Sequence, residues 1–502
     1  MAEHYNAADA LLLPNLVAAR FNRIAVIDDA GRYTYGELNA RANRFANMLR
    51  TRGVVSGERV LLCLNDGIDF PVCFLGAMRA GVIPVPLNTL LTAQDYAYIV
   101  ADSEARLAVI STAIASGWDA ALGVNPHLDV MWSGDTDAES SLHRAMAGSS
   151  DHQITAPTHR DAVAFWLYTS GTTGKPKGVM HRHGSLEFTA QSYARHILEI
   201  HQDDVVFSAA KLFFAYGLGN ALTFPFSVGA TAVLTAARPT PTLIKELFER
   251  HQPTVFCGVP TLYAMLLASG ALAAPGRLRV CISAGEALPE AILERWRIAM
   301  GLDILDGIGT TEMLHIFISN RAGEVAPGTS GHGVPGYEAR VVGDDGTTLA
   351  ANDVGNLEVR GISSAVGYWH LPDASAQTFR DGWVRTGDKY LRRPSGELVY
   401  SGRRDDLLKV GGIYVAPHEV ENALLRHPVV VEAAVVGARD ADGLIKPKAF
   451  VVVDAEPSTQ LAAELIAFVR SELADYKRPR WVEFVAELPK TATGKIQRFK
   501  LR

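Results

Sequence analysis

The sequence has few cysteines and no targeting segment, and both absences limit where the protein is expected to work. Four cysteines occur in 502 residues, with no CxxC pair and no zinc-site spacing, and they lie among apolar neighbours. Such cysteines are predicted to be buried free thiols of a reducing compartment. The first residues lack a basic segment followed by an apolar run, so no signal peptide is predicted and the expected location is cytoplasmic.

Long apolar runs and an excess of positive charge are also lacking. No apolar run reaches the ~18 residues that a membrane span requires. The formal net charge is −6 and no long basic run occurs, so neither a membrane nor a nucleic acid is expected as a partner. Internal repeats and low-complexity segments are absent, and the composition is that of an ordinary globular protein.

Length and hydrophobic pattern predict an α/β fold with more than one domain. The chain exceeds the roughly 250–300 residues that one core organises. Helical spacing over 35–49 and 69–80 alternates with buried-strand patterns over 59–64 and 82–86, and the alternation recurs over 254–269. This pattern predicts a sheet with helices on its faces. Residues 134–160 are polar and rich in turn formers, and we expect a loop there.

The pattern changes near residue 405. Short β elements are expected over 381–400, before the sequence Gly-Arg-Arg-Asp at 402–405. Beyond it, helices over 417–426 and 461–473 and strands over 429–436 and 448–453 predict a compact α+β unit of normal domain size. We therefore predict a large N-terminal domain of α/β subdomains plus a β element, residues 1–404. A small mobile α+β domain follows, residues 405–502.

A loop after the predicted strand 162–167 is the most informative segment. It reads Tyr-Thr-Ser-Gly-Thr-Thr-Gly-Lys-Pro-Lys-Gly over 168–178 and combines flexible glycines, hydroxyl donors and two lysines, a composition suited to a polyphosphate. It is not a Walker A loop, because Pro176 follows Lys175 where that motif has Ser or Thr opening a helix. The alternative is a flexible surface loop. The residues expected to contact phosphate are Thr169, Ser170, Gly171, Thr172, Thr173, Gly174 and Lys175.

This loop closely resembles the signature loop of the acyl-adenylate-forming superfamily, which includes acyl- and aryl-CoA synthetases, adenylation domains and luciferase. Four further motifs match that superfamily in order over essentially the whole chain. They are Gly-Thr-Thr-Glu at 309–312, Thr-Gly-Asp at 386–388, Gly-Arg-Arg-Asp at 402–405 and Pro-Lys-Thr-Ala-Thr-Gly-Lys at 489–495. Each motif is weak alone, and their order makes the resemblance specific.

The resemblance implies roles for individual residues in forming an acyl-adenylate. Lys495, Thr311 and Glu312 would be catalytic. Glu312 would also bind the magnesium ion of ATP, and Asp405 would be the hinge. The remaining ATP-binding residues would be Gly285, Glu286, Asp306, Gly307, Ile308, Asp388 and Arg403. Ile308 stands where the superfamily often has a tyrosine that stacks on adenine. Outside the family context, each role has a structural alternative. Lys495 would be an exposed lysine of the tail, Glu312 a carboxylate at the start of a helix, and Asp388 an aspartate in a turn.

A narrower resemblance, to benzoate- and hydroxybenzoate-CoA ligases, rests on the segments 208–220, 283–288 and 306–317. It implies an acyl pocket lined by Phe214, Ala215, Tyr216, Gly309, His315 and Ile316. Phe213, Phe214 and Tyr216 form an aromatic group that would suit a flat benzene ring. The alternative is that these aromatic residues only fill the core.

Two other patterns are weaker. His181 and His183 at i and i+2, without a nearby third ligand, do not make a convincing metal site. Ser-Ala-Gly-Glu at 283–286 is not the Gly-x-Ser-x-Gly turn of a serine hydrolase.

The resemblance implies an ATP-dependent aryl-CoA ligase, benzoate-CoA ligase-like, that uses ATP, Mg²⁺ and coenzyme A and has an aryl carboxylate as its small-molecule substrate. The alternatives are a stand-alone aryl adenylation enzyme loading a carrier protein and a catalytically silent nucleotide- or acyl-CoA-binding protein. Two further partners stay open: a second copy in a homodimer, and a lysine acetyltransferase acting on Lys495. The sequence does not indicate which ring substituents are accepted.

Overall fold

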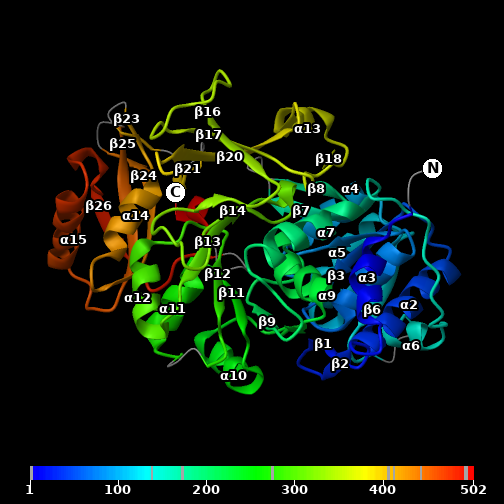
Figure 1. The fold of residues 1–502 in the computed structure, drawn as a ribbon. Helices are drawn as coiled ribbons and strands as arrows, with labels where there is room; N and C mark the ends of the chain where they lie inside the picture. Colours follow the sequence, from blue (N-terminus) through cyan, green and yellow to red (C-terminus); the bar gives the residue numbers. More distant parts are fainter. Residues whose placement is uncertain are drawn as a thin grey trace.

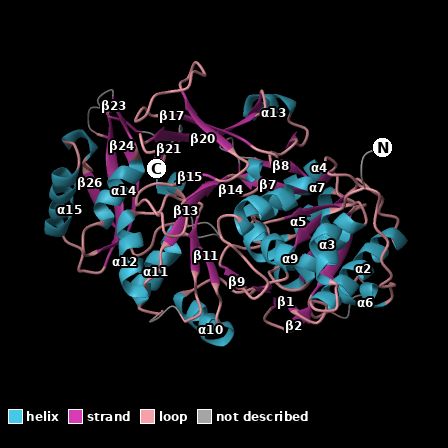
Figure 2. Cartoon of the chain, viewed as in Figure 1, coloured by secondary structure: helices cyan, strands magenta, loops and turns pink. Residues whose placement is uncertain are grey.

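The computed structural model describes residues 4–136, 140–170, 175–272, 276–403, 408–410, 413–440, 444–490 and 496–501. The chain runs from an N-terminal α/β layer at one end of the molecule to a small C-terminal unit at the other (Figure 1). Helices flank the central strands (Figure 2). The predicted α/β class with a small C-terminal α+β domain is confirmed.

The N-terminal layer is a parallel sheet of strand order β4-β3-β5-β6, within the described residues. Its strands are β3 (Arg59–Cys63), β4 (Ile83–Pro86), β5 (Leu107–Ser111) and β6 (Asp129–Ser133). Its helices are α1 (Ala7–Leu12), α2 (Tyr35–Thr51), α3 (Asp69–Arg79), α4 (Ala93–Ser103), α5 (Asp119–Val124) and α6 (Leu142–Ala147). A capping box of Thr34 and Glu37 begins α2, because each side chain bonds the other residue's backbone N–H.

The largest sheet has the order β15-β14-β13-β12-β11-β9-β10-β1-β2 in the described part of the chain. Its strands are β1 (Ile24–Ile27), β2 (Arg32–Thr34), β9 (Val205–Ser208), β10 (Thr231–Val233), β11 (Val255–Gly258), β12 (Val280–Ser283), β13 (Ile304–Gly309), β14 (Ile316–Ser319) and β15 (His332–Gly333). The strands from β1 to β13 in this order are parallel to their neighbours. Their carboxyl ends therefore share one edge, the usual location of ligands in such sheets.

Helices of the same region are α7 (His183–Thr189), α8 (Ala215–Leu218), α9 (Phe224–Val228), α10 (Pro241–His251), α11 (Pro260–Ser269) and α12 (Glu290–Met300). A third sheet joins β7 (Val163–Ser170), β8 (Pro176–Arg182) and β18 (Gly367–Tyr368). A fourth contains β16 (Glu338–Val342), β17 (Gly355–Arg360), β19 (Phe379–Arg380), β20 (Trp383–Arg392) and β21 (Leu398–Arg403), with α13 (Pro372–Thr378) beside it.

The C-terminal unit has its own core. It contains β22 (Leu408–Val410), β23 (Ile413–Val415), α14 (Pro417–Leu425), β24 (Val430–Arg439), β25 (Ile445–Val453), α15 (Thr459–Glu472) and β26 (Trp481–Phe484). One hydrophobic cluster there draws all its residues from positions 408–484. The boundary predicted between residues 404 and 405 lies outside the described residues and stays a prediction.

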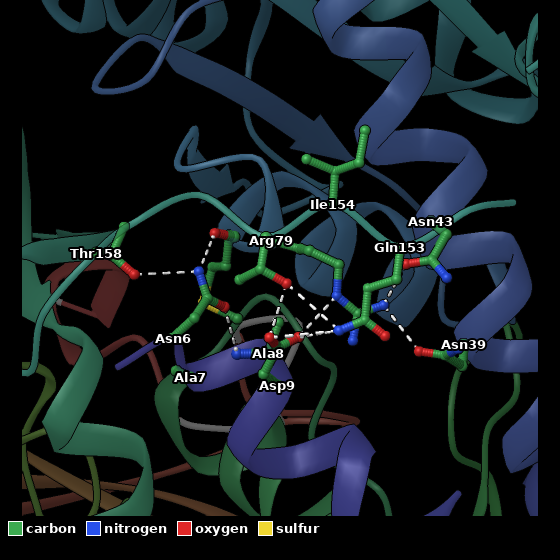
Figure 3. Close-up of polar contacts among 12 residues, drawn as sticks. Asn6, Ala7, Ala8, Asp9, Asn39, Asn43, Arg79, Gln153, Ile154 and Thr158 are labelled. Atoms are coloured by element: carbon green, nitrogen blue, oxygen red, sulfur yellow. Dashed lines mark hydrogen bonds and ion pairs between the residues drawn. The ribbon is translucent and has the colours of Figure 1, made fainter. Parts of the chain in front are cut away.

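The expectation of a loop over 134–160 is wrong in part. Residues 142–147 form α6, and the segment 151–158 is fixed to the helices by side-chain hydrogen bonds. Arg79, fully buried, contacts Asp9 at 2.9 Å, Asn39 at 2.8 Å and Asn43 at 2.6 Å (Figure 3). The second carboxylate oxygen of Asp9 accepts a hydrogen bond from Thr155 at 2.7 Å. The polar composition predicted an exposed loop, whereas these polar side chains form hydrogen bonds with one another.

All four cysteines are buried and unpaired, as predicted. Within the described residues, no helix is long and apolar enough to cross a membrane.

Candidate active site

The signature loop joins two antiparallel strands. Thr169 near the end of β7 pairs with Lys177 of β8, and Ser170 pairs with Pro176. Gly171, Thr172, Thr173 and Gly174 lie outside the described residues, so their predicted contacts stay predictions. The Nζ atom of Lys175 lies 5.2 Å from the ring centroid of Tyr98, and that of Lys177 lies 5.2 Å from the ring centroid of Tyr368. Both loop lysines therefore lie over tyrosine rings.

A short turn between β13 and β14 carries Thr311 and Glu312. It is a 3₁₀ turn over Thr311–Met313, capped by the hydroxyl of Thr310, which accepts from the Met313 N–H. The hydroxyl of Tyr368 donates to Oε1 of Glu312 at 2.8 Å. His181 Nε2 lies 2.8 Å from the carbonyl oxygen of Thr311. Two residues far away in the sequence thus hold this turn in place.

Burial keeps His181 neutral, because it lowers the pKa of this imidazole to about 3. A neutral ring with its proton on Nε2 can donate to the Thr311 carbonyl. His183 lies elsewhere and accepts from the Ala7 N–H at 3.1 Å. The two histidines therefore contact separate parts of the chain. No sequence pattern indicates the contacts of His181 and Tyr368, because their partners lie far away along the chain.

The Thr-Gly-Asp motif, which is predicted to bind ribose, lies on paired strands. Asp388 of β20 is the Cα partner of Arg403 of β21, and the Asp388 N–H donates to the Thr386 hydroxyl at 3.1 Å. Asp388 is buried. The structure places the two predicted ligands side by side along the backbone.

The C-terminal segment reaches the N-terminal domain at Glu286. Oε1 of Glu286 accepts from the Ile496 N–H at 3.0 Å, and Oε2 lies 3.4 Å from the Thr261 hydroxyl. Gly285 precedes it with a φ of 93°, a conformation that glycine adopts readily. Lys495 itself, like Asp405, lies outside the described residues. Its chain neighbour Ile496 is nevertheless held at a predicted ATP-binding residue.

Asp306, Gly307 and Ile308 lie along β13. Burial raises the pKa of Asp306 well above its ordinary value. A Cβ atom on Gly307 would lie 2.8 Å from the Cγ2 atom of Ile316, so a larger residue would collide with β14. Ile308 pairs with Ile318 and packs against a hydrophobic cluster, an apolar surface where the superfamily often has tyrosine.

Four of the predicted acyl-pocket residues lie close together: Tyr216, Gly309, His315 and Ile316. The rings of Tyr216 and His315 have centroids 5.7 Å apart. Gly309 pairs with Ile316, and a Cβ atom on Gly309 would lie 2.5 Å from the His315 carbonyl oxygen. The Tyr216 hydroxyl donates toward the carbonyls of Gly258 at 3.1 Å and Ile282 at 3.3 Å. This group therefore lies at the carboxyl ends of β11 and β12.

Phe214 and Ala215 lie beside this group in the chain but pack differently. Phe214 stacks at an angle on Phe213, with centroids 4.6 Å apart, and both Phe214 and Ala215 pack against the N-terminal core. Tyr216 packs against the neighbouring core. The aromatic group expected from the sequence is thus divided between two cores, and the pocket roles of Phe214 and Ala215 stay predictions.

The pocket residues are uncharged. Burial lowers the pKa of His315 to about 3, so its ring is neutral near pH 7. Both ring nitrogens are buried without a hydrogen-bond partner among the described residues. Burial also raises the pKa of Tyr216 well above its ordinary value, which keeps the phenol protonated. An apolar ring with a polar substituent is the kind of group that such a surface can bind.

Family comparisons agree with this arrangement. The family model described as AMP-binding enzyme matches residues 15–369, and the model of the AMP-binding enzyme C-terminal domain matches residues 419–495. The chain is 55% identical to benzoate–CoA ligase of Thauera aromatica, covering 100% of this chain and 96% of that protein. It is 46% identical to 4-hydroxybenzoate–CoA/benzoate–CoA ligase of Rhodopseudomonas palustris, covering 99% and 94%.

Solved structures of two CoA ligases also resemble this chain along nearly its whole length. A benzoate CoA ligase from Burkholderia xenovorans LB400 matches with a TM-score of 0.94 at 50% identity, covering 99% of this chain and 100% of that one. The anthranilate CoA ligase AuaEII, in complex with anthranoyl-AMP, matches with a TM-score of 0.95 at 40% identity, covering 100% and 97%.

Proposed function

The chain belongs to the AMP-binding enzyme family, and from that premise we propose that it is an ATP-dependent aryl-CoA ligase acting on benzoate or a substituted benzoate. The carboxylate attacks the α-phosphorus of ATP, a P–O bond forms and diphosphate leaves. The coenzyme A thiol then attacks the carbonyl carbon of the acyl-adenylate, and AMP leaves as the thioester forms. The named relatives that act on benzoate support this reaction.

One observation carries the proposal most directly. The buried, neutral His315, whose ring centroid lies 5.7 Å from that of Tyr216, is on the same short connection between β13 and β14 as Thr311 and Glu312. An aromatic acid bound against Tyr216 and His315 would therefore have its carboxylate near the residues expected to bind ATP. Holding two reacting groups in place converts a bimolecular step into an effectively unimolecular one.

Lysine and arginine would stabilise the charge that collects at phosphorus. Lys175, Arg403 and Lys495 are the cations proposed for this role, and charge stabilisation is usually a large part of such catalysis. The contact of Ile496 with Glu286 supports this role for Lys495, because it holds the adjoining segment beside a predicted ATP-binding residue.

Magnesium fits as an ion that arrives with ATP. No cluster of three or more His, Cys, Asp or Glu side chains suitable for a metal occurs in the described part of the chain. Mg²⁺ is commonly held by one or two carboxylates together with substrate phosphates. Glu312 would supply that carboxylate, since its Oε2 atom has no hydrogen-bond partner among the described residues. When bound, the ion would neutralise phosphate charge.

A substrate panel tests the proposal. With ATP, Mg²⁺ and coenzyme A, kcat/KM should be highest for benzoate or a simple ring-substituted benzoate among benzoates, hydroxybenzoates, aminobenzoates, hexanoate and acetate. Higher kcat/KM for hexanoate or acetate than for every benzoate would refute an aryl ligase. Thioester formation with free coenzyme A alone would distinguish a ligase from an enzyme that loads only a carrier protein.

A further inference from the structure

A recess lies beside β1 of the large sheet, and none of the predicted active-site residues lines it. Its lining extends along β1 from Ile24 to Ile27, the last residue of that strand. The recess has a volume of about 380 Å³, and Ile24, Val205 and Thr231, the first residues of β1, β9 and β10, line it. Because these strands are parallel, their first residues mark the amino-end edge. Tyr216 instead bonds the carbonyls at the carboxyl ends of β11 and β12. The strands β1 and β2 and helix α10 lie together at one edge of the molecule (Figure 1).

Positively charged side chains from separate segments line this recess. They are Arg23 before β1, Arg32 of β2, Arg250 of α10 and Arg277 before β12, and His251 of α10 lies beside them. Arg23 is paired with Asp203 at 3.0 Å. In the described ranges, Arg32, Arg250 and Arg277 make no ion pair. This concentration of positive charge occurs in a chain whose formal net charge is −6.

The nearby histidine responds to these charges. Partial burial lowers the pKa of His251, and the guanidinium groups of Arg250 and Arg32 lower it further. Arg250 and His251 lie in the last turn of α10, where cations favour the helix dipole. The helix dipole therefore accounts for the position of Arg250. It does not account for Arg32 and Arg277, which come from other elements and face the same recess.

We propose that this recess binds a small phosphate-bearing anion of diphosphate type. Guanidinium groups bind phosphate oxygens through two parallel N–H bonds, which lysine cannot match. Three unpaired arginines could balance most of the charge of a diphosphate. A recess bordered by β-strand ends and a helix suits a small anion better than the flat or elongated surface that a nucleic acid contacts. The site is independent of the proposed ligase reaction.

Site-specific arginine modification tests this proposal on the full chain. Phenylglyoxal reaction rates at individual arginines would be measured by peptide mass spectrometry, with and without inorganic diphosphate. We expect at least fivefold slower modification at Arg32, Arg250 and Arg277 with diphosphate, but not with sodium chloride of equal ionic strength. Arg295, an exposed arginine of α12, is the matched control and should react equally in both. Diphosphate bound at the candidate active site would leave Arg32 unprotected.

Two results would overturn the proposal: unchanged rates at Arg32, Arg250 and Arg277, or equal slowing at Arg295. Protection by an oligonucleotide but not by diphosphate would also overturn it, because the occupant would then be a polymer. Parallel titrations with ADP and coenzyme A identify the source of the anion. Protection at lower concentrations of either compound would support a diphosphate carried by a larger ligand, and stronger protection by inorganic diphosphate would support the free anion.

A double variant separates binding from a local change of reactivity. In Arg32→Gln/Arg250→Gln, Arg277 remains as a reporter of the recess. The diphosphate concentration that half-protects Arg277 should rise at least tenfold, whereas Arg295→Gln should leave it unchanged. Both substituted arginines are exposed, so the variant should fold. An unchanged half-protecting concentration in the double variant would refute the role of these arginines.

Discussion

The hydroxyl of Tyr368 lies 2.8 Å from Oε1 of Glu312, although the two residues are 56 positions apart. The same tyrosine ring lies beneath Lys177, whose Nζ atom is 5.2 Å from the ring centroid. Tyr368 therefore connects a lysine of the signature loop with the carboxylate expected to bind magnesium. Loss of the hydroxyl should weaken the orientation of Glu312 without removing either charged group.

Tyr368→Phe tests that connection. We expect the Mg²⁺ concentration for half-maximal activity to rise about tenfold, since one hydrogen bond contributes roughly 0.5–1.5 kcal/mol and more when a charged group accepts it. Calorimetric binding of ATP with Mg²⁺ should weaken in parallel, while the KM for benzoate stays unchanged. Tyr33→Phe, on the edge strand β2, is the control. An equal change in the KM for benzoate would show a general disturbance of the site.

His315→Ala should change the order of preference among ring-substituted benzoates more than it changes the KM for ATP. The buried ring nitrogens of His315 have no partner among the described residues, so a substrate hydroxyl or amino group could bond them. Plain benzoate gains nothing from that contact. Enlarging Ala215 tests the other wall of the predicted pocket. If all benzoates lost activity by the same factor in His315→Ala, the residue would be structural.

The two half-reactions should respond differently to changes at the C-terminal unit. Lys495→Ala should abolish adenylation, measured as diphosphate release, but retain thioester formation from supplied benzoyl-adenylate. Acetylation of Lys495 should act in the same way, because it also removes the charge. Asp405→Pro, which fixes φ, should retain adenylation but abolish thioester formation if the C-terminal domain rotates about this hinge. Equal loss of both half-reactions in both variants, in single-turnover assays, would contradict domain rotation.

Arg79→Ala should strongly destabilise the N-terminal layer. Removing one partner of a buried ion pair costs about 3–5 kcal/mol, and this arginine also bonds Asn39 and Asn43. Arg44→Ala is the matched control, because the ion pair of Arg44 with Asp151 is exposed and worth about 0–1 kcal/mol. Thermal unfolding of both variants gives the comparison. Similar melting temperatures for the two variants would show that the Arg79 network contributes little.

Acid should destabilise the protein through its buried histidines. Burial lowers the pKa to about 3 for His181 and His315 and to about 4 for His183, from an ordinary value of 6.5. Between pH 6.5 and about 4, the unfolded chain binds protons at these residues and the folded protein does not. The free energy of unfolding should therefore fall as pH falls, by up to about 1.4 kcal/mol per pH unit for each histidine.

Denaturant unfolding at several pH values measures that slope. His181→Gln should make it shallower by about one proton, whereas the same change at the exposed His127 should not. An equal slope in the wild type and His181→Gln would mean that His181 does not contribute.

Local structure was predictable where periodicity is strong. The helix expected over 35–49 is α2, and the strand expected over 59–64 is β3, because apolar spacing there reflects one buried face or full burial. The helix α6 was missed because its six residues follow a polar, turn-rich stretch. The pairing of β1 with β10 was also beyond prediction, since neither strand carries a signal for so distant a partner.

The candidate site was likewise predictable only in part. Motif order predicted site roles for Thr311, Glu312 and Asp388, which stay predictions, and Asp388 lies opposite Arg403 in the sheet. His181 and Tyr368 were not predicted, because each acts through one hydrogen bond across a long separation. The sequence pattern also grouped Phe214 with Tyr216, whereas these two residues, two positions apart, pack against different hydrophobic cores.

The position of β1 has a consequence for the order in which the protein can be made. Val26 of β1 pairs with Ala232 of β10, so β1 has a neighbouring strand that is made about 200 residues later. At the usual synthesis rate of about 5–20 residues per second, β1 waits roughly 10–40 seconds for this partner. During this interval β1 can pair with β2, which is made directly after it, but Ala25 and Val26 lack the rest of the sheet that buries them. The nascent chain is therefore expected to need chaperone protection around β1 until β10 has emerged.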